Sequence, residues 1–70
     1  MKKIIHIEGM MCHHCTGRVD KVLNALEGVT AEVSLEGKCA TVTLTKAYDD
    51  NALREIIENE GYTVTKIENA

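Results

Sequence analysis

Apolar and polar residues alternate along three stretches of the chain, which is the pattern of strands with one buried face. These stretches are residues 3–8, 31–36 and 39–45. The dipeptide at residues 36–37, Glu-Gly, lies between the second and the third stretch, and it predicts a β-hairpin that turns there. Val64 and its neighbours predict a short last strand.

Two further stretches have the spacing of three and four residues between apolar positions that is typical of an amphipathic helix. The first runs from about His14 to Glu27, and Gly28 predicts its end. Its apolar stripe consists of Cys15, Val19, Val22, Leu23 and Leu26. This stripe predicts one helix packed by a single face against the sheet.

The second predicted helix follows Asp49 or Asp50, either of which can cap a helix. Residues 60–61, Glu-Gly, predict its end. Its predicted inward face consists of Leu53, Ile56 and Ile57.

The order of the predicted elements is βαββαβ, in a single domain that covers residues 1–70. This order predicts an α+β fold of the ferredoxin-like type, in which a four-stranded antiparallel sheet carries both helices on one face.

The composition limits what a fold of this size can contain. The chain has 70 residues, of which 44% are hydrophobic with no Phe or Trp, so the core should be thin and aliphatic. A net charge of −3 argues against a nucleic-acid partner. The apolar run after residues 1–3 is too short for a signal peptide or a membrane span, so no membrane insertion is expected. Three cysteines, two of them close together, favour the reducing cytoplasm over a secreted disulfide framework.

Cys12 and Cys15 lie in the segment that joins the first predicted strand to the first predicted helix. The N–H groups at the start of a helix carry a partial positive charge, which favours a thiolate over a thiol. The two-residue gap lets both sulfurs converge on one ion, and two soft thiolates favour Cu(I) over Mg²⁺ or Ca²⁺. A structural zinc site needs about four ligands, and no second Cys-x-x-Cys or spaced histidine pair supplies them. The pattern therefore indicates an exchangeable soft-metal site.

The same spacing of cysteines occurs in dithiol oxidoreductases of the thioredoxin type, where the first cysteine, here Cys12, is the nucleophile. Those motifs belong to a larger fold and usually have aromatic and proline neighbours, whereas this chain has neither Pro nor Trp. An enzyme is therefore the weaker interpretation. The structural alternative is an incidental pair of cysteines or a reversible disulfide.

The remaining sulfur and imidazole groups have plainer interpretations. Met10 is expected to fill space beneath the loop rather than to bind a metal. His13 and His14 are expected to be exposed and to tune the thiolates, with direct metal binding as the alternative. His6 is predicted to lie on the surface, on the strand face away from the core. Cys39 is predicted to be a bystander on the sheet face away from the helices.

The motif Gly9-Met10-x-Cys12-x-x-Cys15, followed by an amphipathic helix and much later by Gly61-Tyr62, resembles the heavy-metal-associated domain over essentially the whole chain. Similar members are bacterial copper chaperones and the N-terminal metal-binding domains of copper-transporting P-type ATPases. The resemblance implies the βαββαβ fold, Cu(I) binding by both cysteines of the motif, and a place near the metal for Tyr62. The Tyr62 ring is equally well explained as part of the core.

The leading hypothesis is a copper chaperone that passes Cu(I) by ligand exchange to a copper-transporting P-type ATPase or its metal-binding domain. A copper-responsive regulator is another partner to consider, and two copies that share one copper ion would form a metal-linked homodimer. The alternatives are a regulatory metal-binding domain of a transporter and a carrier of Zn²⁺, Cd²⁺ or Hg²⁺. His13 and His14, which lie between the cysteines, widen the range of metals to consider.

Overall fold

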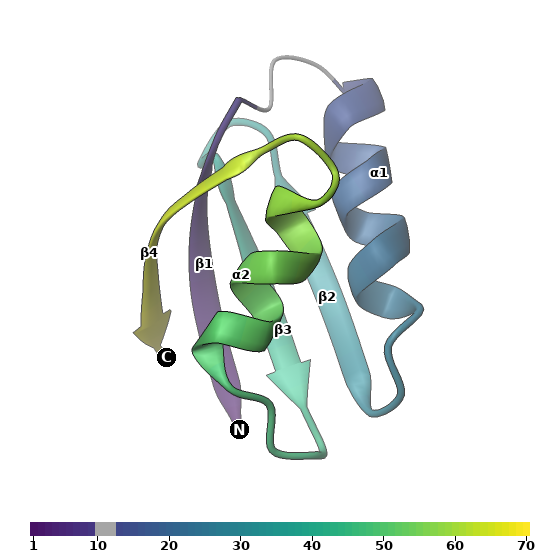
Figure 1. Ribbon diagram of the computed structural model, residues 1–70, viewed down its shortest axis with the longest axis vertical. Coiled ribbons are helices and arrows are strands. Elements are labelled where there is room, and N and C mark those ends of the chain that lie inside the picture. Colours follow the sequence, from purple (N-terminus) through teal and green to yellow (C-terminus); the bar gives the residue numbers. More distant parts are fainter. Residues whose placement is uncertain (10–12) are drawn as a thin grey trace.

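The computed structural model describes residues 1–9 and 13–70, apart from the side chain of His13. The elements follow one another as predicted, in the order βαββαβ (Figure 1). They are β1 (Lys2–Glu8), α1 (His13–Asn24), β2 (Val29–Ser34), β3 (Cys39–Leu44), α2 (Asp50–Glu58) and β4 (Thr63–Asn69).

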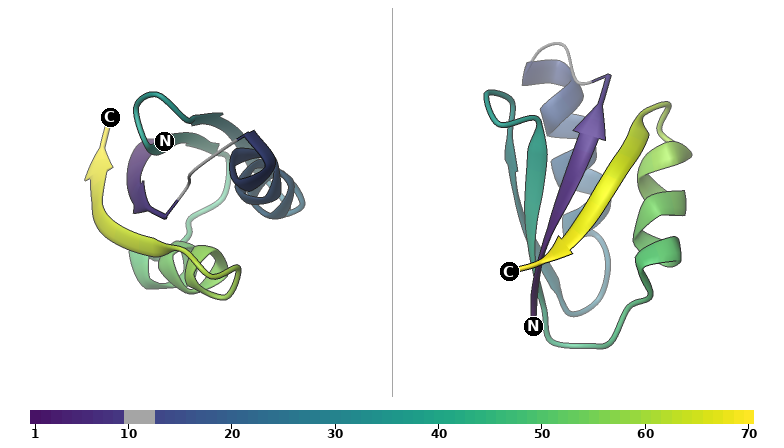
Figure 2. Two further views of the ribbon diagram at one scale, coloured as in Figure 1. Left: turned by 90° about the horizontal axis from the view of Figure 1, so that it is seen from above. Right: turned by 90° about the vertical axis from the view of Figure 1, so that its left-hand side faces the viewer.

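The four strands form one antiparallel sheet in the order β2-β3-β1-β4, so the first and third strands occupy its centre. Both helices cover the same face of this sheet (Figure 2). The amino group of Met1 donates to the carbonyl of Leu44 at 3.2 Å, and the N–H of Ala70 donates to the carbonyl of Lys2 at 2.9 Å. Both termini therefore lie at the end of the molecule opposite to the β1–α1 connection. The ferredoxin-like arrangement predicted from the element order is confirmed.

The core lies between the sheet and the two helices and is aliphatic apart from one tyrosine ring. Its largest fully buried side chains come from the two central strands and from both helices. They are Ile5, Ile7, Leu23, Leu53, Ile57, Val19 and Val42. Such a core fits the absence of Phe and Trp from the sequence.

Helix α1 ends at Asn24, earlier than the predicted end at Glu27, where the Leu26 N–H donates to the carbonyl of Leu23, three residues back, at 3.2 Å. The Asn24 side chain joins this end of the helix to β2. Its Oδ1 accepts from the Ala31 N–H at 2.8 Å, and its Nδ2 donates to the Ala31 carbonyl at 3.2 Å. Ala31 lies on β2, an edge strand, and its backbone groups point away from β3. Asn24 thereby joins the end of the helix to the outer edge of the sheet.

Replacing Asn24 with alanine is expected to destabilise the fold by roughly 1–3 kcal/mol, because both backbone groups of Ala31 lose their partner. The free energy of unfolding in urea measures this cost. Asn51→Ala is the matched control, since Asn51 is an exposed residue of α2. Equal stabilities of the two variants would contradict the role given to Asn24.

Helix α2 is shorter than predicted at its end and starts without the expected side-chain cap. Asp49 occupies the N-cap position, but its side chain makes no capping hydrogen bond. Asp50 instead forms an ion pair with Lys3 of β1, which ties the start of the helix to the sheet. The predicted inward face is confirmed for Leu53 and Ile57, which are buried. Ile56 is only half-buried, so the prediction is wrong for this residue.

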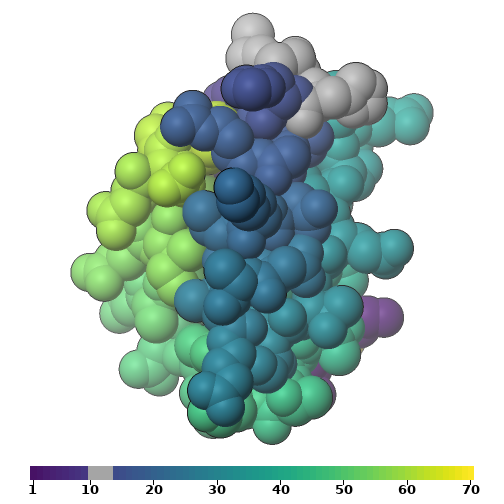
Figure 3. All heavy atoms as spheres, turned by 90° about the vertical axis from the view of Figure 1, so that its right-hand side faces the viewer, coloured from purple at the N-terminus to yellow at the C-terminus, as the bar shows by residue number. Residues whose placement is uncertain are grey.

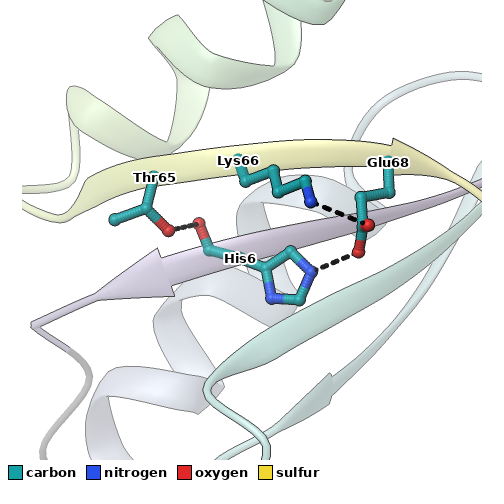
Figure 4. A network of polar contacts seen from close by, with 4 residues as sticks. All are labelled: His6, Thr65, Lys66 and Glu68. Carbon is teal, nitrogen blue, oxygen red and sulfur yellow. Dashed lines mark hydrogen bonds and ion pairs between the residues drawn. The ribbon is translucent and has the colours of Figure 1, made fainter.

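Strand β4 has seven residues and is longer than predicted. The sequence pattern indicated only a short strand because a bulge interrupts the alternation of buried and exposed side chains. The register with β1 shifts between His6 and Ile7, which pair with Lys66 and Val64. Thr65 is the extra residue, and its hydroxyl donates to the His6 carbonyl at 3.3 Å (Figure 4). An extra residue reverses which side chains face the core, and the pattern of a single strand is lost. The hairpin strand β2 also differs, since it ends at Ser34 and leaves residues 35–38 for the turn.

The sheet face away from the helices carries a small polar network that includes His6, as predicted for this surface residue (Figure 4). The imidazole Nε2 lies 2.7 Å from Glu68 Oε2, and Lys66 Nζ lies 3.1 Å from Glu68 Oε1. Both contacts lower the pKa of Glu68, and the hydrogen bond with His6 has the largest effect. Cys39 lies opposite His6 in the register of β1 and β3 and is half-buried on the same open face, where the sequence predicted it.

Candidate metal centre

Several segments that are distant in the sequence meet at the end of the molecule where β1 finishes and α1 starts. Glu8 pairs with Thr63 at the start of β4, and the Ile7 N–H donates to the Lys38 carbonyl of the hairpin turn at 2.9 Å. Figure 3 shows α1 along the centre of one face, between α2 with its following turn on one side and the hairpin strands on the other. The end of β1 therefore lies beside the start of β4 and the β2–β3 turn.

Cys15 lies in the first turn of α1, as predicted, and is half-buried against the core. The first turn contains no acidic residue, so no carboxylate opposes a negative charge on the sulfur. The positive end of the helix dipole favours such a charge. Helix position and partial exposure together suit Cys15 to act as a thiolate at the surface.

Tyr62, in the turn between α2 and β4, is both a core residue and a neighbour of Cys15. Its exposure is 8%, and its ring lies against the backbone of Gly9. A Cβ atom on Gly9 would lie 3.6 Å from Tyr62 Cδ1, and the φ of +97° at Gly9 is one that glycine favours. A hydrogen bond with Cys15 raises the pKa of Tyr62, as do burial and the negative charge on Cys15, whereas Arg18 opposes this shift.

Arg18 belongs to the same group of side chains, although the sequence did not single it out. It lies one turn after Cys15 on α1, and its positive charge acts to lower the pKa of the Tyr62 hydroxyl. Arg18 Nε also lies 4.0 Å from Glu60 Oε1, in the turn that carries Tyr62. The spacing of three residues from Cys15 was the available signal, because residues three apart share one helix face.

Other residues named by the sequence fall at different places. Met10, Cys12 and the side chain of His13 lie outside the described residues. His14 is exposed on the first turn of α1, as expected. Within the part of the chain that the structure describes, no helix is both long and apolar enough to cross a membrane.

A half-buried cysteine lies at the start of a helix that follows a strand and a glycine. This arrangement can be compared with those of known protein families. The sequence model of the family described as "Heavy-metal-associated domain" matches residues 4–63. The chain belongs to the heavy-metal-associated domain family. Cys12, Cys15 and most of the fold, from within β1 to the start of β4, lie inside the matched segment.

The proteins similar to this chain include small metal carriers and domains of transporters. The copper chaperone CopZ of Staphylococcus aureus (strain bovine RF122 / ET3-1) is 39% identical over 69 residues, which cover 90% of this chain and 96% of CopZ. A solved CopZ metallochaperone is 33% identical, with a TM-score of 0.85 over 93% of this chain and all of the other. The N-terminal domain of a potential copper-translocating P-type ATPase from Bacillus subtilis, solved in the Cu(I)-loaded state, is 33% identical, with a TM-score of 0.80 over 97% of this chain and 84% of that domain.

Proposed function

We propose that this protein is a cytoplasmic copper chaperone that binds one Cu(I) ion through the thiolates of Cys12 and Cys15. It passes the ion to a partner that carries its own pair of cysteines, such as the metal-binding domain of a copper-transporting P-type ATPase. The observation that carries the proposal is the position of Cys15, half-buried in the first turn of α1 at one end of the molecule. The similarity to CopZ chaperones over nearly their whole length supports copper as the cargo.

Transfer proceeds by ligand exchange and involves no change in oxidation state. A thiolate of the partner attacks the two-coordinate Cu(I) and forms a three-coordinate bridge between the two proteins. One thiolate of the chaperone then leaves, and the second partner thiolate takes its place as the remaining bond breaks. Soft thiolates and a low coordination number keep each step accessible. Free copper is not released at any point.

The test is the rate of copper transfer in the presence of a chelator that traps free Cu(I). The Cu(I)-loaded protein is mixed with a copper-free metal-binding domain of a P-type ATPase, and a bathocuproine-type chelator is added. Direct exchange predicts that copper reaches the domain faster than the chelator alone withdraws it from the loaded protein. The proposal fails if the domain is loaded no faster than copper dissociates spontaneously.

The cargo is tested by titration of the reduced protein with Cu(I) and Zn²⁺ in competition, followed by size exclusion. We expect one Cu(I) per chain to bind in the presence of excess Zn²⁺, because two thiolates suit the softer ion. Displacement of Cu(I) by Zn²⁺ would favour a zinc carrier, in which His13 or His14 completes the ligand set. A copper-dependent shift to twice the mass would support a metal-linked homodimer.

A second candidate is a metal-binding domain of a transporter, which the similarity to the Bacillus subtilis ATPase domain favours. The match to CopZ chaperones over 96% of their length supports an independent carrier instead. Both candidates use the same ligand pair, so a deletion strain distinguishes them through the copper content of the cell and of its ATPase. In either case we propose that the protein carries copper and catalyses no reaction. It should therefore reduce insulin no faster than a Cys12→Ser control does.

A further inference from the structure

A groove lies between α1 and β2, the strand at one edge of the sheet. Figure 3 shows α1 and the hairpin strands next to each other on one face of the molecule. The groove has a volume of about 360 Å³, and its walls consist of Thr16, Gly17, Asp20, Ala31, Glu32 and Val33. Thr16 directly follows Cys15 in α1, so the groove begins beside the candidate metal centre.

Gly17 lines the groove although the fold itself does not require a glycine there. Glycine is the least favourable residue in a helix interior apart from proline. Outside its own stretch of helix, a Cβ atom at Gly17 would meet no atom of the described residues within 4 Å, so close packing does not explain the glycine. Its φ is not positive either. The missing side chain instead keeps the groove open next to β2.

The other wall of the groove is the outer edge of β2. Alternate residues of an antiparallel strand direct their N–H and C=O groups toward the same neighbour. The Thr45 N–H donates to the Gly28 carbonyl at 2.8 Å, which continues the ladder between β2 and β3. Even-numbered residues of β2 therefore pair with β3, and the main-chain groups of Val29, Ala31 and Val33 point away from it.

Two of these three residues already have partners at the outer edge. The Val29 N–H donates to the Leu26 carbonyl at 3.2 Å, and the Asn24 side chain binds both groups of Ala31. Among the residues that the structure describes, none pairs with the outward N–H and carbonyl of Val33. Strand β2 therefore offers one open pair of donor and acceptor, and this pair borders the groove.

The geometry of a sheet determines where a bound segment places its side chains. A residue that pairs with Val33 directs its side chain to the same face of the sheet as the Val33 side chain, which packs against the core beneath the helices. On this face the incoming side chain meets α1 at Gly17 and Asp20. The lining residues include the carboxylates of Asp20 and Glu32 and no basic group. A basic side chain therefore complements the charge of the groove.

We propose that the groove binds a short extended segment of a partner protein, with an arginine opposite Val33. In an antiparallel pairing, the main chain of this arginine exchanges two hydrogen bonds with Val33, much as the Asn24 side chain does with Ala31. Its guanidinium group lies against the Asp20 carboxylate, which its forked N–H donors match. The inference goes beyond copper carriage, since none of these residues is a proposed copper ligand. A docked segment would hold a partner beside the metal centre.

The test uses the metal-free protein, so it neither needs nor examines copper binding. The capped tripeptide acetyl-Thr-Arg-Val-amide is added to the isotope-labelled protein, and amide shifts and hydrogen exchange are recorded by NMR. In the free protein, the Val33 amide should exchange faster than that of Ala31, which Asn24 protects. Bound peptide should shift the Val33 resonance and slow its exchange. A Val33 resonance that stays unchanged at the highest peptide concentration would overturn the inference.

Two altered peptides separate main-chain pairing from attraction between charges. Methylation of the arginine amide nitrogen keeps the charge but removes the N–H that donates to the Val33 carbonyl. Binding should weaken by roughly 2- to 10-fold, the range that corresponds to one hydrogen bond. A peptide with glutamate in place of arginine should leave Val33 unaffected, because Asp20 and Glu32 repel it. Binding of either altered peptide as tightly as the parent would contradict the proposed pairing.

Variants of the protein locate the peptide in the groove. Gly17→Leu fills the space next to β2 with a residue of higher helix propensity, and it should abolish the response of Val33 to the peptide. Asn51→Leu, at an exposed position of α2, is the control for the added side chain. Asp20→Asn should weaken binding by roughly 1.5- to 5-fold, the range for an exposed ion pair, and Glu55→Gln on α2 should not. A normal response in Gly17→Leu, or an equal loss in Asn51→Leu, would show that the peptide binds elsewhere and overturn the site.

Discussion

Cys15→Ser is expected to lower the affinity for Cu(I) by more than about 100-fold. Loss of a residue that only supports a ligand typically costs about 10- to 100-fold in metal affinity, and we propose Cys15 as a direct ligand. Serine has nearly the same size, so the core beneath the first turn of α1 should remain intact, while its hydroxyl is a poor ligand for a soft ion. Competition with a Cu(I) chelator of known affinity measures the change.

The third cysteine of the chain provides the matched control. Cys39 is a half-buried residue of β3 on the open face of the sheet, and Cys39→Ser should bind copper as the wild type does. Cys12→Ser should resemble Cys15→Ser, since each removes one thiolate of the pair. Retention of full affinity in Cys15→Ser, or an equal loss in Cys39→Ser, would contradict the proposed ligand pair.

Ile57→Ala is expected to destabilise the fold by about 2–5 kcal/mol, the cost of a cavity left by a large buried side chain. Ile57 is fully buried between α2 and the sheet. A single small domain has roughly 3–5 kcal/mol of stability from its core, so a large part of the variant should be unfolded at room temperature. Urea titration followed by circular dichroism measures the loss.

Ile56 offers a control of the same residue type at the next position of the same helix. It is half-buried and lies outside the core cluster, so Ile56→Ala should cost about 1 kcal/mol or less. Similar losses for the two variants would show that α2 packs on the sheet through a broader face than the structure has.

Most of the fold could be predicted from the sequence because its signals are local. The alternation in β1, β2 and β3 and the apolar stripe of α1 each follow from the period of one element. The differences arise where tertiary contacts decide. Hydrogen bonds from Asn24 join the end of α1 to β2, and a bulge at Thr65 shifts the register of β4 with β1. Neither contact leaves a signal within its own segment.

The candidate site was predictable only in part, for the same reason. Cys15 could be placed in the first turn of α1 from the helix period alone. The contact between Tyr62 and Cys15 joins distant parts of the chain, and it was expected only from the resemblance to a family. Arg18 was missed because a charged residue on an exposed helix usually faces solvent. Tyr62, on which its charge acts, comes from another element, and only the folded chain brings the two together.

The position of the two termini has a practical consequence. The hydrogen bonds of Met1 and Ala70 fix both ends of the chain at the pole opposite to Cys15, in a molecule 29 Å long. A surface anchor, a fluorophore or a second protein attached at either end would therefore leave the cysteine pole facing outward. Exchange kinetics recorded on such an immobilised or labelled protein should match those of the free protein.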